Sequence, residues 1–530
     1  MATGSGLERL SDTLKVQSCL SAHVNRILGQ NPGMMTLQGT NSYLLQPPSS
    51  SLAPIILVDT SSPHTAQQYV DLLFAHLHNL GLQSGLRETH FESKAAQQNL
   101  TNVPEDRREA VKKSIVQARL DDPTLDTEFY LEDYGPGAEW TAPSTQDRRL
   151  PPIEHIVLTH RHLDHTGALK LLLTTLKKYG LPKPRIWKLP SSDEASLLAS
   201  ERERPTSDAE LLAQLPDGTY HPFSPFQPIH PILPGLMISI IDPDYRHLLK
   251  HDKEGKPKWN EVPEIARVSV RCLKTPGHTM DSVSLVMLEG EKGVFTGDTV
   301  LGQGTTVFTD LAAYMTSLKT LLALKPNVLY PAHGPHIPSS AASMAHIQTY
   351  IKHRQDREDE IVRILQAVHA DPSVLPKLMV KYKQGIRAEV IEKETFNSAG
   401  EYAMKMDGKY DTTEQKEKRK LELEEREKEI KVSFEGDEHV GGITIALLVR
   451  MIYVSDDEKL VQAAGKSVKS HLEKLEADNK VGKTSVRVPV LVEADLGEVE
   501  EQEGWTWLAN AEREQAEQGE AEEAQQGKTE

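Results

Sequence analysis

Short apolar runs alternate with amphipathic segments along the first 365 residues of the chain. Runs of β-branched and other apolar residues predict strands, and apolar residues three or four positions apart predict helices. The predicted strands cover residues 37–45, 55–59, 153–159, 185–189, 268–273, 293–295 and 327–329. The predicted helices cover residues 66–80, 168–179, 311–324 and 341–365. Alternating strands and helices indicate a layered α/β fold, but this pattern does not distinguish one α/β fold from another.

Two stretches interrupt this pattern. Residues 83–150 are polar, lack clear periodicity and contain Gly-Pro-Gly at residues 135–137, so we interpret them as an exposed insertion that is partly helical near residues 107–120. Residues 191–262 are rich in proline. Proline at this density permits turns and short edges, but no long helix beyond about residues 193–215.

The C-terminal part of the chain consists of a highly charged stretch, a segment with an apolar pattern and an acidic tail. Residues 414–431 hold seven acidic and seven basic residues, which predicts a solvated helix with i,i+4 ion pairs; a nucleic-acid-binding arm is the alternative. The apolar pattern returns with predicted helices at 443–454 and 458–477 and an alternating strand at 484–492. Residues 491–530 then hold thirteen acidic residues against two basic ones, so most of the net charge of −17 lies in a tail of disordered type.

Candidate metal ligands directly follow the strand predicted at residues 153–159. The sequence His-Arg-His-Leu-Asp-His at residues 160–165 places three imidazoles and a carboxylate within six positions. His160 and His162 are two positions apart at a strand end, so both side chains can turn toward one point. Asp164 and His165 can address a second point nearby. Imidazole nitrogens and carboxylate oxygens are ligands that Zn²⁺ prefers.

Three further turns each present one residue of the same kind after an apolar run. They carry His278 in Thr-Pro-Gly-His-Thr, Asp298 in Thr-Gly-Asp-Thr and His333 in Tyr-Pro-Ala-His-Gly. A strand followed by a glycine-containing turn can deliver a ligand to a shared site. The alternative is a set of unrelated surface histidines in a chain that has 21 of them. Four repeats of the same arrangement favour a site for two metal ions.

These motifs resemble the metallo-β-lactamase superfamily, whose H-x-H-x-D-H motif stands at residues 160–165. Residues 31–44 and 301–308 and the sequence His-Gly-Pro at 333–335 are similar to the beta-lactamase-like protein 2 family. The match covers most of residues 20–365 outside the insertions and resumes weakly near residue 440. The resemblance implies a four-layer αβ/βα sandwich, with two mixed sheets back to back and helices outside, followed by a small winged-helix-like domain.

Three regions are therefore expected. Residues 1–350 would form the metallo-β-lactamase-like domain with insertions at about 83–150 and 191–262. Residues 351–492 would form the winged-helix-like domain, interrupted by a charged insertion at about 385–440, and residues 493–530 would be an acidic, disordered tail. The separation of His165 from His278 is wide for the superfamily, which predicts an enlarged loop near the mouth of the site.

The resemblance also implies a role for each candidate residue. One Zn²⁺ would be held by His160, His162 and His278, and a second by Asp164, His165 and His333, with Asp298 bridging the pair. The implied cofactor is two Zn²⁺ per chain, and the implied chemistry is hydrolysis by a metal-activated water that Asp164 helps to orient. Asp59 would support the site from behind; the alternative is a turn-forming aspartate at a strand end.

Composition restricts the class of protein. The 530 residues suffice for two to four domains, and no apolar run approaches the ~18 residues of a membrane helix. The first thirty residues lack the apolar centre of a signal peptide. Cys19 and Cys272 are too few for a disulfide framework and have no metal-type spacing. We therefore expect an intracellular protein without a membrane partner, cytoplasmic or else mitochondrial; the sequence does not specify its oligomeric state.

The substrate stays open at the level of sequence. The resemblance implies an endoribonuclease acting on single-stranded RNA, but related fungal-type proteins with these motifs are thioesterases that release polyketides from an acyl carrier protein in secondary metabolism. Glyoxalase-type thioesterases favour a third histidine where this chain has Arg161. The winged-helix-like segment favours RNA, whereas the acidic balance favours a thioester. A non-catalytic scaffold is a third alternative, against which the seven filled ligand positions argue.

Overall fold

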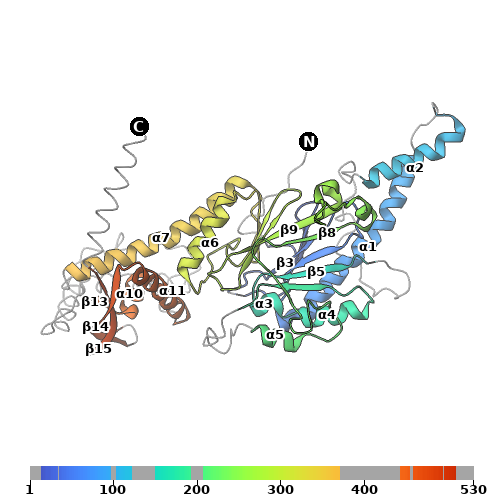
Figure 1. The fold of residues 1–530 in the computed structure, drawn as a ribbon. Coiled ribbons are helices and arrows are strands. Elements are labelled where there is room, and N and C mark those ends of the chain that lie inside the picture. Colours follow the sequence, from blue (N-terminus) through green and yellow to red (C-terminus); the bar gives the residue numbers. More distant parts are fainter. Residues whose placement is uncertain are drawn as a thin grey trace, which may run out of the picture. The chain divides into compact units, whose positions relative to one another are not determined.

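The computed structural model describes residues 13–33, 35–96, 103–121, 150–191, 207–370, 442–453, 458–492 and 495–508. The chain forms two compact units, whose elements are labelled in Figure 1. Unit 1 comprises Met1–Thr306 and Ala313–Tyr350, and unit 2 comprises Val307–Ala312 and Ile351–Glu530. The charged insertion expected at about 385–440 lies outside the described residues.

Unit 1 contains a seven-stranded mixed sheet, sheet 1, whose strands follow one another in chain order. Its strands are β1 (Gln17–Cys19), β2 (Val24–Leu28), β3 (Asn41–Leu45), β4 (Ile55–Val58), β5 (Ile153–Leu158), β6 (Arg185–Lys188) and β7 (His230–Pro231). The first four strands pair antiparallel, and β4 to β7 pair parallel. Parallel pairing brings the carboxyl ends of β4, β5 and β6 to one edge of the sheet.

A second mixed sheet, sheet 2, has five strands in the order β12-β11-β10-β9-β8. Its strands are β8 (Met237–Ile241), β9 (Arg267–Lys274), β10 (Val283–Met287), β11 (Val294–Gly297) and β12 (Leu329–Pro331). The pairing is antiparallel from β8 to β11 and parallel between β11 and β12.

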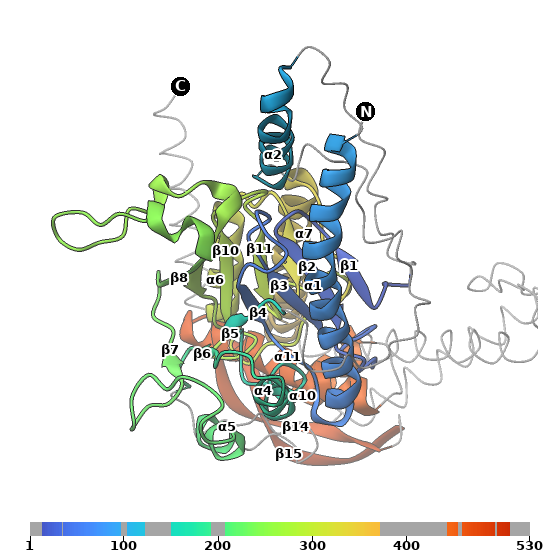
Figure 2. The ribbon, with the colours of Figure 1, turned by 90° about the vertical axis from the view of Figure 1, so that its right-hand side faces the viewer.

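The period of two along the strands divides their side chains between two cores. In β4, Ile55 and Leu57 belong to the core beneath the helices, whereas Ile56 and Val58 belong to the core between the two sheets. The helix-side core includes residues of α1 (Ala66–Ala96) and α4 (Leu169–Lys178), which lie against sheet 1 (Figure 2). Sheet 1 is therefore buried on both faces, as a layered sandwich requires.

On the side of sheet 2, the helix α6 (Leu311–Ala323) fixes two of the loops that follow strands. The hydroxyl of Tyr314 donates to the backbone oxygen of Thr299 (2.7 Å), and the hydroxyl of Ser317 donates to that of Pro276 (2.7 Å). The next helix, α7 (Ser340–Ala370), begins in unit 1 and continues into unit 2. Two mixed sheets back to back with helices outside confirm the predicted architecture.

Several elements differ from the sequence-based predictions. Helix α1 continues to Ala96 and is followed by α2 (Glu105–Asp121), so the insertion predicted at 83–150 begins as an extension of a helix. Of the region 193–215, where a helix was expected, the described residues form the short helix α5 (Asp208–Gln214). Ser207 and Glu210 form a capping box at its start. The proline-rich stretch 191–262 is not only loop, because it contains β7 and the edge strand β8, whose Ile238 and Ile240 are buried.

Within the described residues, unit 2 combines the last part of α7 and two further helices with a three-stranded sheet of order β13-β15-β14. Its elements are β13 (Gly442–Ile443), α10 (Ile445–Ile452), α11 (Glu458–Ala477), β14 (Val481–Val492) and β15 (Asp495–Trp507). The disordered tail predicted from residue 493 is wrong for β15, because Trp505 and Trp507 fill the core of this unit at a spacing of two and anchor the strand. Residues 509–530 lie outside the described residues.

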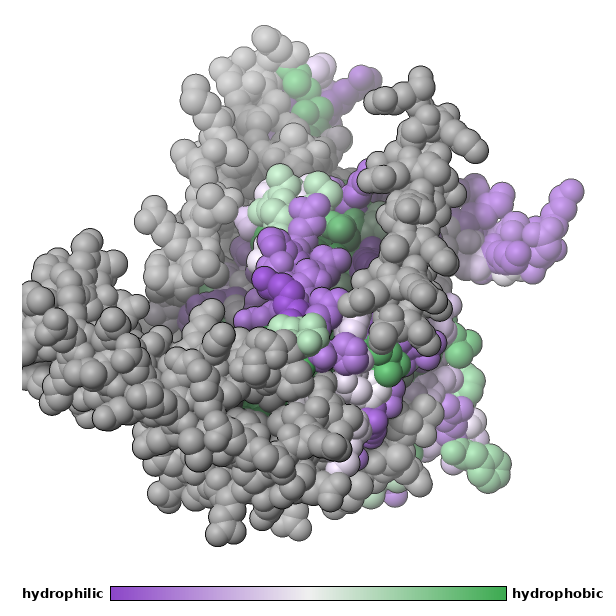
Figure 3. Space-filling view, turned by 90° about the vertical axis from the view of Figure 1, so that its left-hand side faces the viewer, coloured by the Kyte–Doolittle hydropathy of each residue, from purple (hydrophilic) through white to green (hydrophobic). Residues whose placement is uncertain are grey.

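Hydrophilic residues dominate the coloured part of the face in Figure 3, with apolar residues in small groups between them. None of the helices in the described part of the chain combines the length and apolar character that crossing a bilayer requires.

The helix-side core of unit 1 predicts that alanine substitutions at two nearby positions of α4 differ in their effect on stability. Leu172 is fully buried and Lys170 is exposed. We expect Leu172→Ala to lower the free energy of unfolding by about 2–5 kcal/mol, because it removes buried methyl groups and leaves a cavity. Lys170→Ala, the matched control, should change it by about 0.5 kcal/mol or less. Urea unfolding followed by circular dichroism measures both values, and equal effects would contradict this description of the core.

Candidate metal centre

All seven predicted ligands lie together at the edge of the sandwich where the strands end. His160 and His162 follow β5, Asp164 and His165 stand in the short helix α3 (Leu163–Thr166), and the others follow strands of sheet 2. They form two groups: His160, His162, His278 and Asp298 in the first, and Asp164, His165 and His333 in the second. Within each group, one nitrogen or oxygen atom of every residue lies within 4.8 Å of the others.

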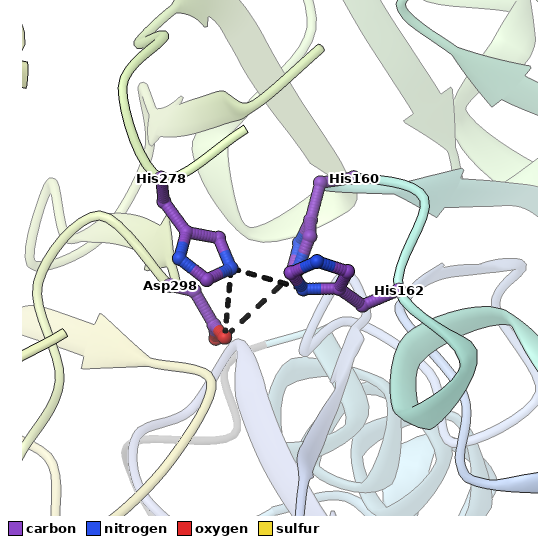
Figure 4. A group of neighbouring side chains, drawn as sticks. All are labelled: His160, His162, His278 and Asp298. Atoms are coloured by element: carbon purple, nitrogen blue, oxygen red, sulfur yellow. Dashed lines mark hydrogen bonds and ion pairs between the residues drawn. The ribbon is translucent and has the colours of Figure 1, made fainter. Parts of the chain in front are cut away.

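The first group converges from two directions. Figure 4 shows His160 and His162 pointing from their loop toward His278 and Asp298 on the opposite side. The Nδ1 atom of His162 lies 2.9 Å from His160 Nε2 and 3.0 Å from His278 Nε2. Three ring nitrogens that face one point cannot all be paired by hydrogen bonds among themselves, since each contact needs one donor and one acceptor.

Asp298 faces both groups at once. Its Oδ2 atom lies 3.4 Å from His278 Nε2 and 3.9 Å from His160 Nε2 in the first group. Its Oδ1 atom lies 3.5 Å from His165 Nε2 and 3.3 Å from His333 Nε2 in the second. The two oxygens of one carboxylate are therefore shared between the groups.

In the second group, the spacing of the donor atoms fits a metal ion. A tetrahedral zinc ion at about 2.0–2.2 Å from each ligand places neighbouring ligand atoms about 3.3–3.6 Å apart. Asp164 Oδ2 lies 3.3 Å from both His165 Nε2 and His333 Nε2, within this range. In addition, His165 Nε2 and Asp298 Oδ1 are buried and lie 3.5 Å apart without forming a hydrogen bond of normal geometry within the described part of the chain. Buried polar atoms without partners are costly, and a cation between them would remove that cost.

Asp59, at the end of β4, lies behind the ligands. Its Oδ1 accepts a hydrogen bond from the backbone nitrogen of Thr159 (2.8 Å), and its Oδ2 accepts one from the Thr159 hydroxyl (2.7 Å). Its Oδ2 also lies 2.9 Å from His165 Nδ1. Asp59 has a φ of 59°, a conformation that residues other than glycine adopt rarely. These contacts favour the supporting role over the simple turn.

These hydrogen bonds select the tautomers of two ligands. Because the Thr159 hydroxyl gives its proton to Asp59, its oxygen is left to accept from His160 Nδ1 at 3.0 Å. His165 likewise donates from Nδ1 to Asp59. His160 therefore keeps the lone pair of Nε2 for the site, as the outer contacts of metal-bound histidines require. Burial opposes a charge on His165, but the carboxylates of Asp164, Asp298 and Asp59 raise its pKa well above the usual range, so a metal ion must displace the proton on its Nε2.

Burial and neighbouring charges set the protonation of the two groups differently. Burial and the adjacent His278 lower the pKa of His162 to about 3, and burial with His165 and His162 holds the pKa of His160 well below its usual range. Both are therefore neutral at pH 7. Burial also opposes a charge on His333, but the carboxylates of Asp298 and Asp164 outweigh it and raise its pKa to about 9. A metal ion in the second group must displace that proton.

The loop of His278 depends on a glycine. Gly277 has a φ of 134°, and a side chain there would meet the Cα of Tyr314 at 2.4 Å. Only glycine combines this conformation with so close an approach to α6. Thr306 supports the same loop, since its hydroxyl lies 3.2 Å from His278 Nδ1.

Sequence reasoning missed several supporting residues. Asn41 donates from Nδ2 to the backbone oxygens of Pro331 and Gly334, both at 2.8 Å, and so fixes the turn that carries His333. Thr159 and Thr306 contact His160 and His278 as described above. Asn41 lies within the segment 31–44 whose resemblance to a known family was noted, and that similarity was its only signal. Arg161, in the middle of the motif, is buried and donates to Ser191 Oγ (3.2 Å).

Comparisons with known proteins agree with this fold. Residues 124–333 match the family described as the metallo-beta-lactamase superfamily, and residues 444–487 match the beta-lactamase associated winged helix domain. The chain therefore contains a metallo-beta-lactamase superfamily domain followed by a winged helix domain of the associated type.

Individual relatives are more distant. The chain is 28% identical over 353 residues to the beta-lactamase-like protein 2 homolog of Caenorhabditis elegans, covering 66% of this chain and 72% of that protein. It is 40% identical over 98 residues to the lactamase-like protein nscB of Trichophyton equinum, covering 18% of this chain and 28% of that protein. The crystal structure of a metallo-beta-lactamase family protein from Thermus thermophilus aligns with a TM-score of 0.41 at 15% identity, covering 92% of this chain and all of that one.

The contacts of Asp59 predict a loss of metal affinity without a change of ligand. In Asp59→Asn, an amide group replaces one acceptor oxygen, so His165 and Thr159 lose the partner that orders their protons. We expect the zinc affinity to fall about 10- to 100-fold. Asp71→Asn, on the exposed face of α1, is the control and should bind zinc like the unchanged protein. Competition with a chromogenic chelator measures both affinities, and equal values for the two variants would refute the supporting role of Asp59.

Proposed function

We propose that this protein is a hydrolase that binds two zinc ions and cuts phosphodiester bonds in single-stranded RNA. One observation carries the first half of this proposal: Asp298 presents one carboxylate oxygen to each ligand group, at 3.3–3.9 Å from their imidazole nitrogens. A shared carboxylate is what a site for two neighbouring cations requires, and two-metal sites are used for in-line displacement at phosphorus.

The residues of this site have different roles. Zinc bound there would supply a water nucleophile at neutral pH and would stabilise the negative charge that develops on the substrate. Asp164 and His162 are partly exposed, whereas His160, His165 and His333 are buried, so the substrate approaches on the side of Asp164 and His162. Asp164 is ionised, because His165 and His333 lower its pKa well below the usual range despite its burial. It can therefore accept a hydrogen bond from the attacking water and orient it.

Two features support RNA as the substrate. The chain carries a winged helix domain at residues 444–487, and small helical domains of this kind can hold a nucleic acid next to a catalytic domain. The similarity to the beta-lactamase-like protein 2 homolog also extends over 353 residues, far beyond the ligand motifs. The resemblance seen in the sequence links that family to single-stranded RNA.

A thioesterase acting on an acyl carrier protein is the second candidate. The match of 98 residues to the lactamase-like protein nscB favours it, because its identity of 40% is higher than that of the longer match. The same ligands would then stabilise the oxyanion that develops at a thioester carbonyl. The two candidates share the site and differ only in what approaches it.

Asp298→Asn tests the shared carboxylate and the substrate together. An amide offers only one acceptor oxygen and no charge, so we expect cleavage of a single-stranded RNA oligonucleotide to fall about 10³-fold or more. Removal of metal by a chelator should abolish cleavage, and added zinc should restore it in the unchanged protein only. The matched control is Asp217→Asn, an exposed aspartate, which should leave the rate unchanged.

The same preparations must also be assayed on a simple acyl thioester. Cleavage of RNA without cleavage of the thioester supports the first candidate. Cleavage of the thioester alone would replace it by the second, and activity of Asp298→Asn at the control rate on either substrate would remove the two-metal site from the account.

A further inference from the structure

Two hollows open at the edge of unit 1, away from the metal ligands. The larger, of about 300 Å³, is lined by His155 of β5, Trp187 of β6, Met237 of β8 and Trp259, together with three smaller residues. The second, of about 240 Å³, is lined by Glu154, Lys183, Arg185, His221 and Arg246 together with two prolines. The metal chemistry described above uses none of these residues.

The larger hollow is aromatic, and its rings are held in place. Trp187 donates from Nε1 to His155 Nδ1 at 3.0 Å. The ring of His230 lies 4.6 Å from that of Trp187, and the ring of Phe223 lies 5.4 Å from that of His230. A row of rings thus leads from the hollow to Phe223, which is 55% exposed, near Phe226, which is 99% exposed. Only 5% of the chain is aromatic, so exposed rings gathered at one place need an explanation.

The second hollow is positively charged. Lys183, Arg185 and Arg246 line it, and Glu154 is its one carboxylate. Glu154 lies 3.5 Å from Arg185 and 3.8 Å from Arg246, so it offsets a single charge of the three. The chain as a whole carries a net charge of −17, and a basic hollow on such a protein can attract an anionic group to this place.

The two hollows share the same two strands. β5 contributes His155 to the larger hollow and Glu154 to the second. In β6, Arg185 and Trp187 are two positions apart, about 7 Å along the strand, and so lie on the same face of it. An aromatic surface beside a cationic one, at this separation, is complementary to a planar heterocycle attached to a phosphate. Stacking on aromatic rings and contact of phosphates with basic side chains are how proteins hold single-stranded nucleic acids.

We propose that these hollows bind one nucleotide unit of a single-stranded RNA, with the base against Trp187 and Trp259 and the phosphate against Lys183, Arg185 and Arg246. The strand β5 runs from this site toward the ligand loop, and His160 lies five positions after His155, about 16 Å along the strand. The site therefore holds the RNA at a distance from the bond that is cut. This inference rests on the proposed function for its choice of RNA.

Binding of a labelled 12-nucleotide oligo(A) to the full chain tests the site, with metal removed by a chelator so that the strand stays intact. We expect Trp187→Leu to weaken binding about 5- to 100-fold, because one base loses its stacking surface. Since Trp187 also contacts the core, Lys183→Gln combined with Arg246→Gln is a second test at exposed positions. That pair should weaken binding several-fold and reduce its dependence on salt. The control is Lys319→Gln, an exposed lysine of α6, which should bind like the unchanged protein.

The outcomes separate this inference from the proposed function. If zinc-loaded protein cuts no RNA but both sets of variants still weaken binding, the nucleotide site stands and the nuclease proposal fails. If RNA is cut and both sets of variants bind and cut it with unchanged affinity and KM, the nucleotide site is wrong and the nuclease proposal stands. Competition by 5′-AMP at the same concentration as the oligonucleotide would show a site for free nucleotides and would overturn the binding of a strand.

Discussion

The structure depends on one constraint: the nitrogen and oxygen atoms of several buried imidazoles and carboxylates face one another at one place. Five imidazoles and two carboxylates converge at one edge of the sandwich, and most of their donor atoms are removed from water. In the first group the imidazoles of His160 and His162 are neutral, and without a cation their facing nitrogen atoms would carry the cost of unpaired buried polar groups. In the second group a cation would take the place of the proton that the carboxylates hold on His333. Two cations would balance these charges, and Asp298, which faces both groups, joins the two positions into a single site.

The fold supplies the precision that such a site needs. Parallel pairing in sheet 1 and the adjacent ends of β9, β11 and β12 in sheet 2 bring the ligand loops to one edge. Each loop is then fixed by contacts from behind: Asp59 for the loop of His160 and His165, and Asn41 for the turn of His333. The site is thus built on the ends of rigid elements, which suits chemistry that requires fixed ligand positions.

The ligand positions could be predicted from sequence because each stands in a short local pattern, a strand followed by a polar turn. The supporting contacts could not, because Thr159, Thr306 and Asn41 act through tertiary neighbours that no local pattern reveals. The same reason explains the errors in the fold. Strand β8 lies in a proline-rich stretch and β15 in an acidic one, so neither has a clear local strand pattern. β8 forms because it pairs with β9, and β15 because it pairs with β14, and these pairings place their apolar residues in a core.

The central claim is that two metal ions share Asp298. X-ray absorption at the zinc edge, on protein whose metal content has been determined, measures this most directly. The structure predicts two zinc ions per chain, mainly nitrogen and oxygen ligands, and a metal–metal distance of about 3.5–4 Å. A single zinc ion per chain, or two zinc ions with no metal neighbour within this distance, would contradict it.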